Sequence, residues 1–600
     1  MVFVWSARRY ARRRSLVMPL EVRIEVRLGL PFGKNSDVGE LPELTRRERD
    51  VLIALCEPVL TDDVFAEPAS VSEIARELVV TDAAVKQHLL HLYDKFGIAP
   101  AGGRRRTKLA RAAIKLGGVD LAVPVGRRAL DAGRAAFDRQ DWETAWRLLS
   151  EADASSRLEP ADLEKVGEAG FWTNQHEQAL AFRQRAYQSY LGADDLERAA
   201  FMAVVLTIHY VARMEFAVAG GWYAKAERLL ETLPESFAHG HFAFVTALFA
   251  EASGDWQAVR EAATSLHSLG CRCGDADLQA LGLAFQGLAA THLEEVAAGM
   301  KLLDESMATA TAGELTTFAT GVVYCRMLCA CLDLQDFARA GEWTDVIRAC
   351  GPTAGLGGLP GDCRTHRAAV LAKRGSWDEG LNEAELAVKE NETFFMPHLG
   401  IAAREVGEIM LLRGDLAGAE RAFVRAHGFG VSPEPGMSLL RLKRGDVDAA
   451  AKGLDAALAE VGEDRLARAR LLPARVEIAL AIGDLADADA AVAELEETGK
   501  RYGTAALRAA AEHTHGALDL ASGNADEAAA RLVSGQRLWL RLEAPYDAAR
   551  AGELLAEAHL CRGDHDAGIL ELRAAAAAYD RLGAALDAHR SSHRLAELST

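Results

Sequence analysis

The chain has 600 residues, half of them hydrophobic but only 6% aromatic, and its formal net charge at pH 7 is −19. The length allows several domains, and an Ala- and Leu-rich composition with few aromatic residues favours helices over sheets. The acidic surplus excludes general nucleic-acid binding by the chain as a whole, and without a run of eighteen apolar residues we expect no transmembrane helix and no membrane partner.

Residues 1–35 are predicted to form a basic leader. Arg8, Arg9 and residues 12–14 are cationic, and no apolar stretch of signal-peptide length follows them. We expect residues 1–17 to be a disordered leader, with a start at Met18 or an arm that touches phosphates as the alternatives. Residues 22–28 alternate with period two and predict a short strand.

Charge is unevenly distributed along the chain. Residues 1–128 contain 22 Lys and Arg against 16 Asp and Glu, a balance of +6, and the remaining residues contain 46 against 71, a balance of −25. A basic head on an acidic body fits DNA contact confined to the head. The alternative is that the acidic charge is simply that of a cytosolic protein surface and is unrelated to DNA.

Residues 71–98 predict two short helices joined by a tight polar turn. Apolar residues of the first helix face a core, and Thr81 or Asp82 can cap the second by accepting its free backbone N–H groups. Gly97 supplies the residue that ends the second helix. The apolar stripe of the second helix, at a spacing of 3.6 residues, consists of Val85, Leu89, Leu92 and Phe96.

Two short helices with a tight turn form a helix-turn-helix, whose second helix fits the major groove of DNA. The side opposite the apolar stripe is therefore the candidate reading face. Gln87 can hydrogen-bond an adenine edge, and Lys86 and His88 can reach bases or phosphates. Asp94 shares this face, and its carboxylate would oppose phosphate contact.

Several spaced elements follow in a fixed order: residues 44–52 (LTRRERDVL), 73–75 (EIA), Leu78, Thr81, Val85, Lys86, His88 and 95–98 (KFGI). This succession resembles the LuxR/GerE-type DNA-binding domain over residues 41–119. The resemblance implies a helix-turn-helix domain within residues 36–122, with Lys86 and His88 near DNA and Glu48 in a structural first helix. Extra residues around 61–68 depart from the family pattern.

A basic run at residues 104–108 precedes a predicted fourth helix at 109–116. Clustered cations could supply the salt-dependent, sequence-independent part of DNA affinity, and a solvated loop is the alternative. The candidate DNA-binding residues are Thr81, Ala83, Lys86, Gln87, His88, His91, Lys95, Arg104, Arg105, Arg106 and Lys108.

From residue 124 onward the sequence repeats. The repeated unit is a small residue, a second small residue twelve positions later, a bulky residue four positions after that, and a third small residue three positions further on. Gly407, Ala419, Phe423 and Ala426 follow this pattern. Between the predicted helices a Gly-Asp or Gly-Asn pair recurs, with Gly ending one helix and Asp capping the next. Further copies begin at Gly133, Gly516 and Ala556, and the turns are at Gly254, Gly414, Gly445, Gly483, Gly523 and Gly563.

This pattern resembles tetratricopeptide repeats (TPR) over residues 124–600. The resemblance implies a superhelix of helix pairs whose inner face is a binding groove, each pair being stabilised mainly by its neighbours. Residues 351–361, rich in Gly and Pro, predict a break. The predicted fold class is all-α: a small helix-turn-helix domain followed by a long TPR-like α-solenoid.

The nine cysteines are scattered, and none has the C-x2-C spacing of a structural zinc site. Cys325 and Cys329 share a predicted helix face, and Cys363 lies three residues before His366. Buried Cys acting as a small hydrophobe in a reducing cytoplasm accounts better for them. We therefore expect no metal, no cofactor and no catalytic residues.

Two functions remain. The first is a bacterial transcription regulator whose repeats sense a protein, peptide or small molecule. It would be cytoplasmic, bind double-stranded DNA as a homodimer, and be nucleoid-associated when bound. RNA polymerase is a further candidate partner. The second is a protein-interaction scaffold whose helix-turn-helix no longer binds DNA, which Leu90 and Asp94 favour. An enzyme is disfavoured, and the sequence specifies neither operator, effector, sign of regulation nor oligomeric state.

Overall fold

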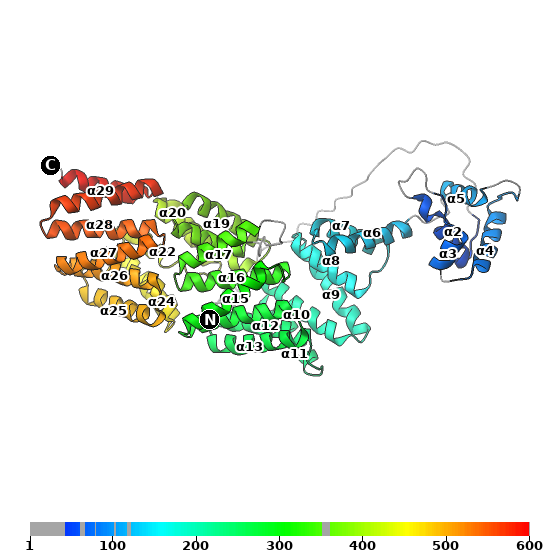
Figure 1. Ribbon diagram of the computed structural model, residues 1–600, viewed down its shortest axis with the longest axis horizontal. Helices are drawn as coiled ribbons and strands as arrows, with labels where there is room; N and C mark the ends of the chain where they lie inside the picture. Colours follow the sequence, from blue (N-terminus) through cyan, green and yellow to red (C-terminus); the bar gives the residue numbers. More distant parts are fainter. Residues whose placement is uncertain are drawn as a thin grey trace, which may run out of the picture. The chain divides into compact units, whose positions relative to one another are not determined.

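The computed structural model describes residues 42–60, 67–78, 80–100, 104–116, 122–350 and 361–598. All regular secondary structure in these ranges is helical (Figure 1), which confirms the predicted all-α class. None of the helices in the described ranges is both long enough and apolar enough to cross a bilayer. The predicted leader and strand at 1–35 lie outside the described residues, as do residues 351–360 of the predicted break.

The chain divides into two compact units between Phe182 and Arg183, and the amino-terminal unit begins with four helices, α2–α5, hereafter the head. Apolar side chains of the head form a hydrophobic core whose buried members lie between residues 51 and 113. Three residues of the predicted apolar stripe, Val85, Leu89 and Leu92, are buried in this core, and Phe96, just after α4, packs against it partly buried. The elements of this unit are α2 (Arg46–Cys56), η1 (Glu57–Leu60), α3 (Val71–Glu77), α4 (Asp82–Lys95), α5 (Arg105–Lys115), α6 (Ala122–Asp138), α7 (Trp142–Ser155), α8 (Pro160–Trp172) and the beginning of α9 (His176–Gly192).

Side-chain caps fix where the head helices begin. Thr45 and Glu48 cap α2 reciprocally: the Glu48 N–H donates to Thr45 Oγ1 (3.3 Å), and the Thr45 N–H donates to the Glu48 carboxylate (2.8 Å). Thr81 caps α4, as predicted, by accepting from the Ala84 N–H at 3.3 Å. The helices α3 and α4 are therefore two short helices joined by residues 78–81.

The carboxy-terminal unit is a succession of antiparallel helix pairs, in which each helix from α10 onward packs against the next (Figure 1, green to red). Its elements are the end of α9, α10 (Leu196–Ala212), α11 (Phe216–Leu230), α12 (Phe237–Ser253), α13 (Trp256–Cys273), α14 (Ala276–His292), α15 (Val296–Thr311), α16 (Thr317–Asp333), α17 (Phe337–Cys350), α18 (Asp362–Lys373), α19 (Trp377–Asn391), η3 (Met396–His398), α20 (Leu399–Arg413), α21 (Leu416–Gly428), α22 (Gly436–Lys443), α23 (Val447–Val461), α24 (Arg465–Ile482), α25 (Leu485–Tyr502), α26 (Ala505–Ala521), α27 (Ala525–Arg541), α28 (Pro545–Cys561), α29 (His565–Leu582) and α30 (Ala585–Leu598).

The predicted small and bulky positions meet where paired helices approach each other. A Cβ atom at Gly407 of α20 would lie 2.6 Å from two ring carbons of Phe423 on α21. Ala419, Phe423 and Ala426 are all fully buried. The copy that begins at Gly516 places this glycine against a leucine of the following helix in the same way. The repeat rule predicted from the sequence is therefore confirmed in the packing.

The predicted Gly-Asp turns end one helix and begin the next. Gly414 has a φ of +87°, in the left-handed region that glycine adopts without strain, and the Asp415 side chain accepts from the Gly418 N–H at 2.8 Å. Asn524 makes no such side-chain cap. The same cap is made by Asp255, Asp446, Asp484 and Asp564.

The carboxy-terminal unit has an inner and an outer layer of helices. Successive even-numbered helices from α10 to α28 contact one another, whereas among the odd-numbered helices of the described ranges only α15 and α17 approach as closely. Helices on the concave side of a curved stack lie closer together than those on the convex side. We therefore assign the even-numbered helices to the inner layer and the odd-numbered helices to the outer layer.

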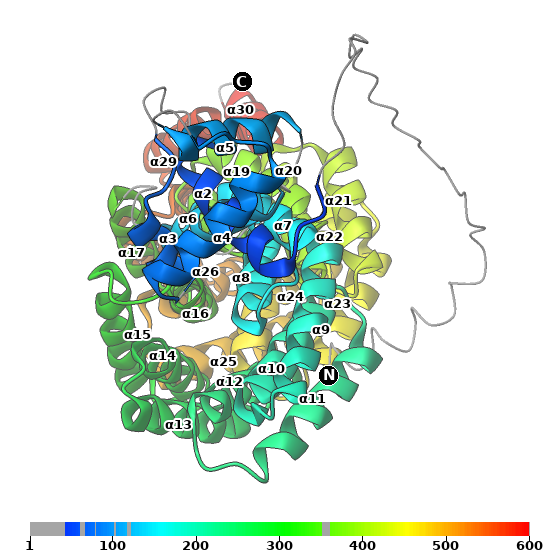
Figure 2. The same ribbon diagram turned by 90° about the vertical axis from the view of Figure 1, so that its right-hand side faces the viewer.

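Contacts between distant parts of this unit close the stack on itself (Figures 1 and 2). Glu294, which follows α14, pairs with Arg501 near the end of α25 at 3.2 Å. Trp377 of α19 packs edge-on against Tyr546 of α28, with ring centroids 5.6 Å apart. One hydrophobic cluster joins residues of α18–α20 to residues of α28–α30. Stabilisation by sequence neighbours, as the repeats alone implied, is therefore only part of what holds this array together.

Candidate functional site

The face of α4 turned away from the head core carries the predicted recognition residues. Lys86, Gln87 and His91 are exposed there. Leu90 on the same face is 53% exposed, and the Asp94 carboxylate is exposed beside it. The face therefore combines a cation, an amide and an imidazole with an apolar group and a negative charge.

The other predicted residues at the start of α4 have different surroundings. Thr81 uses its Oγ1 to cap the helix, and Ala83 exposes only a methyl group. His88 is half-buried, and its Nδ1 is enclosed without a hydrogen-bond partner among the described residues. Lys86, Gln87 and His91 therefore present exposed polar groups on this face of the helix.

Lys95 interacts with the head itself. Its Nζ donates to the Glu48 carboxylate at 2.7 Å and to the Glu43 carbonyl at 2.8 Å. Glu48 is only 4% exposed. Hydrogen bonds from Lys95 and Thr45 lower the pKa of Glu48 from 4.5 to about 2, although burial acts in the opposite direction. We therefore assign Lys95 to holding α4 against α2.

Two of the cations in the predicted basic run are also engaged within the head. The Arg105 guanidinium lies 4.1 Å from the centre of the Tyr93 ring and donates to a backbone carbonyl. Arg106 donates to the Ala69 carbonyl at 2.8 Å. Arg104 and Lys108 are exposed. The structure therefore places the eleven predicted residues in two groups, one at the surface and one that supports the fold.

Charged side chains of both signs gather on the inner layer of the array. Arg550 of α28 pairs with Glu477 of α24 at 2.6 Å, past the intervening α26, and the two side chains are 34% and 36% exposed. Arg326 of α16 pairs with Glu251 of α12 past α14. Burial acts to raise the pKa of Glu477, but the charge of Arg550 outweighs it and lowers this pKa.

Glu405 of α20 lies on the same layer and has a strongly perturbed acidity. Burial and the neighbouring Glu408 carboxylate together raise the pKa of Glu405 from 4.5 to about 7, although the charges of Arg404 and Arg470 act in the opposite direction. Perturbed carboxyl groups of this kind are concentrated at functional sites. The sequence analysis did not identify these inner-layer residues, because helices distant in the chain bring the partners together.

No protein-family model matches this chain, and no curated protein matches it. A solved structure of the APC/C hetero-tetramer Cut9–Hcn1 is similar with a TM-score of 0.33 and 13% identity, over 77% of this chain and 95% of that chain. A tetratricopeptide repeat protein from Parabacteroides merdae ATCC 43184 is similar with a TM-score of 0.26 and 15% identity, over 53% of this chain and 98% of that chain. At these TM-scores neither likeness carries an argument, so the repeat architecture rests on the helix packing, and LuxR/GerE and TPR remain resemblances of the sequence.

Proposed function

We propose that the chain is a protein-interaction scaffold whose helical array binds a Lys- and Arg-rich segment of another protein. The observation that carries the proposal is the charged inner layer of the array, which belongs to a part of the chain, residues 129–600, with 25 more acidic than basic residues. Stacked helix pairs offer an extended concave surface to a partner. A basic polypeptide segment complements the negative surplus of residues 129–600 and can also exchange ion pairs with groups such as Arg550 and Glu477.

The test compares one inner and one outer carboxylate in the full chain. Glu477→Gln removes a negative charge from α24 of the inner layer. Asp378→Asn removes one from α19 of the outer layer, where the Asp378 side chain is 92% exposed and pairs with an arginine at 2.8 Å. The two variants therefore match in charge and differ in position.

Binding of a labelled Lys/Arg-rich peptide is measured by fluorescence anisotropy over a salt series, beside a peptide with Asp and Glu at the same positions. We expect only the basic peptide to bind, more weakly at higher salt. Glu477→Gln should lower its affinity about threefold to tenfold, or about 1 kcal/mol, and Asp378→Asn should lower it less than twofold. Equal losses in both variants, or no binding at low salt, would contradict the proposal.

DNA binding by the head is the second candidate function, and the exposed polar residues of α4 favour it. Lys86 and Gln87 project from α4, which follows the shorter α3 after four residues, and a helix in this arrangement can enter the major groove. In this case the chain is a transcription regulator: a homodimer occupies paired half-sites, RNA polymerase is a further partner, and the protein is cytoplasmic and nucleoid-associated.

Selection of genomic fragments by the full chain, followed by affinity measurements across salt concentrations, tests this second function. Lys86→Ala should weaken the selected sites by about 1–3 kcal/mol if Lys86 contacts a base. Lys301→Ala, which removes an exposed cation from α15 of the array, is the control and should leave affinity unchanged. If no fragment is retained at low salt, the head does not bind DNA and scaffolding alone remains.

A further inference from the structure

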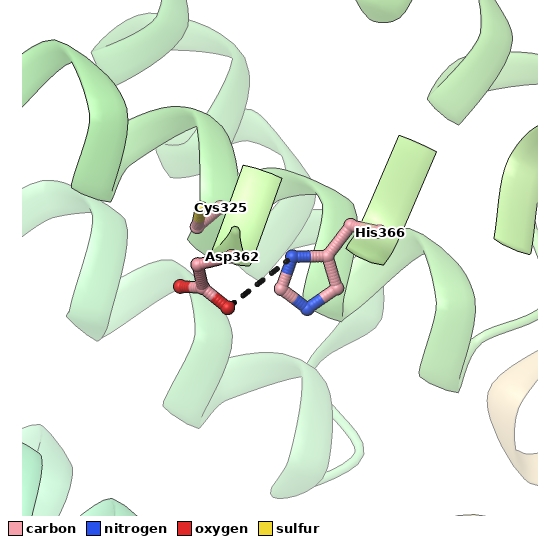
Figure 3. A group of neighbouring side chains, drawn as sticks. All are labelled: Cys325, Asp362 and His366. Carbon is pink, nitrogen blue, oxygen red and sulfur yellow. Dashed lines mark ion pairs between the residues drawn. The ribbon is translucent and has the colours of Figure 1, made fainter. Parts of the chain in front are cut away.

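Cys325, Asp362 and His366 come together from two inner-layer helices (Figure 3). Cys325 lies within α16, and Asp362 and His366 lie one turn apart at the start of α18. One potential ligand atom of each residue lies within 4.8 Å of the other two, and no other group of this kind occurs in the described ranges. Cys325 is fully buried, Asp362 is 6% exposed, and the His366 side chain is 13% exposed. The arrangement is a compact, largely dry set of sulfur, oxygen and nitrogen donors.

The imidazole of His366 has one ring nitrogen that nothing in the described structure satisfies. Its Nδ1 faces Asp362 Oδ1 at 4.0 Å, too far for a hydrogen bond, and has no hydrogen-bond partner among the described residues. Its Nε2 lies 3.2 Å from the Cys329 sulfur. A buried polar atom without a partner needs an explanation, and a bound ion is one. Histidines that bind a metal use one nitrogen for the ion while a neighbour orients the other, so Nδ1 is the candidate donor and Cys329 the orienting neighbour.

Neighbouring residues supply a fourth donor and support for the carboxylate. The Cys363 sulfur lies 2.9 Å from the Cys325 sulfur. His398 Nδ1 lies 2.9 Å from Asp362 Oδ1, at ion-pair distance but without hydrogen-bond geometry. Carboxylates that bind metals are commonly held by such an outer partner. The cluster therefore contains three donors that lie close to one another and a second thiol in contact with Cys325.

The positive charge nearest to Cys325 in the sequence is compensated. Arg326 of α16 pairs with Glu251 of α12, which reduces the repulsion between its guanidinium and a bound cation. A divalent ion would bind Cys325 as the thiolate and release its proton.

We propose that Cys325, Asp362 and His366 are ligands of a buried divalent ion of the zinc class. Cys363 supplies the fourth, thiolate ligand. Thiolate and imidazole donors favour Zn²⁺ over the oxygen-binding Mg²⁺ and Ca²⁺. Four protein ligands without an open position are typical of a structural site. The ion joins α16 to α18 within the inner layer, and this role is independent of both functions proposed above.

The experiment uses the full chain with the exposed Cys271, Cys273 and Cys561 replaced by Ser, so that these three thiols hold no metal. After expression with added zinc and exhaustive dialysis, this parent chain should retain about one zinc ion per molecule by plasma mass spectrometry. Replacement of the ion by Co²⁺ should give thiolate-to-cobalt charge transfer and the intense visible bands of tetrahedral cobalt. Both readouts are independent of peptide or DNA binding.

Two ligand variants and one matched control localise the ion. Cys325→Ser and His366→Ala should each weaken metal retention about tenfold or more. Cys331→Ser places the same hydroxyl at another buried position of α16, where the sulfur contacts Met327 at 3.7 Å, and should retain the ion. A lower melting temperature after chelation of the parent chain, but not of Cys325→Ser, would show that the ion stabilises the fold.

Three results would overturn the proposal. The first is a parent chain that retains no zinc and shows no tetrahedral cobalt spectrum. The second is retention of the metal by both ligand variants. The third is a disulfide between Cys325 and Cys363, found by peptide mapping of the purified protein. If a ligand variant fails to fold, the stoichiometry and the cobalt spectrum of the parent chain still decide the question.

Discussion

Replacing Lys95 by Met should destabilise the head, because the variant keeps the aliphatic stem but leaves the buried Glu48 carboxylate without its cation. The lowering of the Glu48 pKa from 4.5 to about 2 corresponds, at about 1.36 kcal/mol per unit, to about 3 kcal/mol for all of its partners together. Thr45 provides part of this stabilisation, and the Lys95 side chain is 33% exposed to screening solvent. The loss from Lys95→Met alone should therefore be about 2 kcal/mol.

The pH dependence of this loss follows from the sign of the shift. The pKa of Glu48 is lower in the folded chain than in the unfolded chain, so its contribution to stability is complete above pH 4.5 and disappears as the pH falls toward 2. The free-energy difference between the wild-type chain and Lys95→Met should consequently be constant near neutral pH and shrink in acid.

Hydrogen exchange of peptides from α2 and α4 in the full chain measures the effect at pH 7. Lys86→Met is the matched control, because it makes the same change at an exposed position of the same helix. The free energy of opening reported by exchange in α2 and α4 should fall by about 2 kcal/mol in Lys95→Met and remain unchanged in Lys86→Met. If Lys95→Met retains wild-type protection, or if both variants lose it equally, the assignment of Lys95 to the fold is wrong.

Three further predictions concern the array. Phe423→Ala should lower the stability of the array by about 3–5 kcal/mol, because it leaves a cavity at the fully buried position against Gly407. Hydrogen exchange in α20 and α21 measures this loss, and unchanged exchange would contradict the packing. Glu405→Gln should stabilise the chain by about 1–3 kcal/mol at pH 8 but little at pH 4.5, measured by denaturation, because the folded pKa of about 7 makes ionisation unfavourable above the unfolded value of 4.5. Trp377→Ala should speed exchange in α28, which holds Tyr546, as well as in α19; an effect confined to α19 would show that the distant contact contributes nothing.

The sequence predicted the helical repeats correctly because the relevant signals are local. A small residue is required wherever paired helices approach closely, and Gly407 against Phe423 shows that requirement directly. The Gly-Asp turns combine a residue that adopts a positive φ with one that caps the next helix, as at Gly414 and Asp415. In the head, the stripe of α4 and the cap at Thr81 were likewise readable from short-range spacing.

The functional preference from the sequence, a DNA-binding regulator, receives less support from the structure than the scaffold does. Sequence spacing alone could not distinguish a cation that faces solvent from one that holds the fold. Lys86 and Lys95 lie on the same predicted helix, but Lys95 reaches a carboxylate on another helix. Arg106 likewise reaches the Ala69 carbonyl.

Residue types and their local periodicity determined the helices, their caps and the repeat, because those depend on contacts between near neighbours in the chain. The tertiary structure decided which charges pair across the inner layer, which distant helices close the array, and that Cys325 meets Asp362 and His366. These arrangements depend on the curvature accumulated over many helix pairs. A small rotation at each pair sets which distant side chains meet, and no local pattern in the sequence specifies that sum.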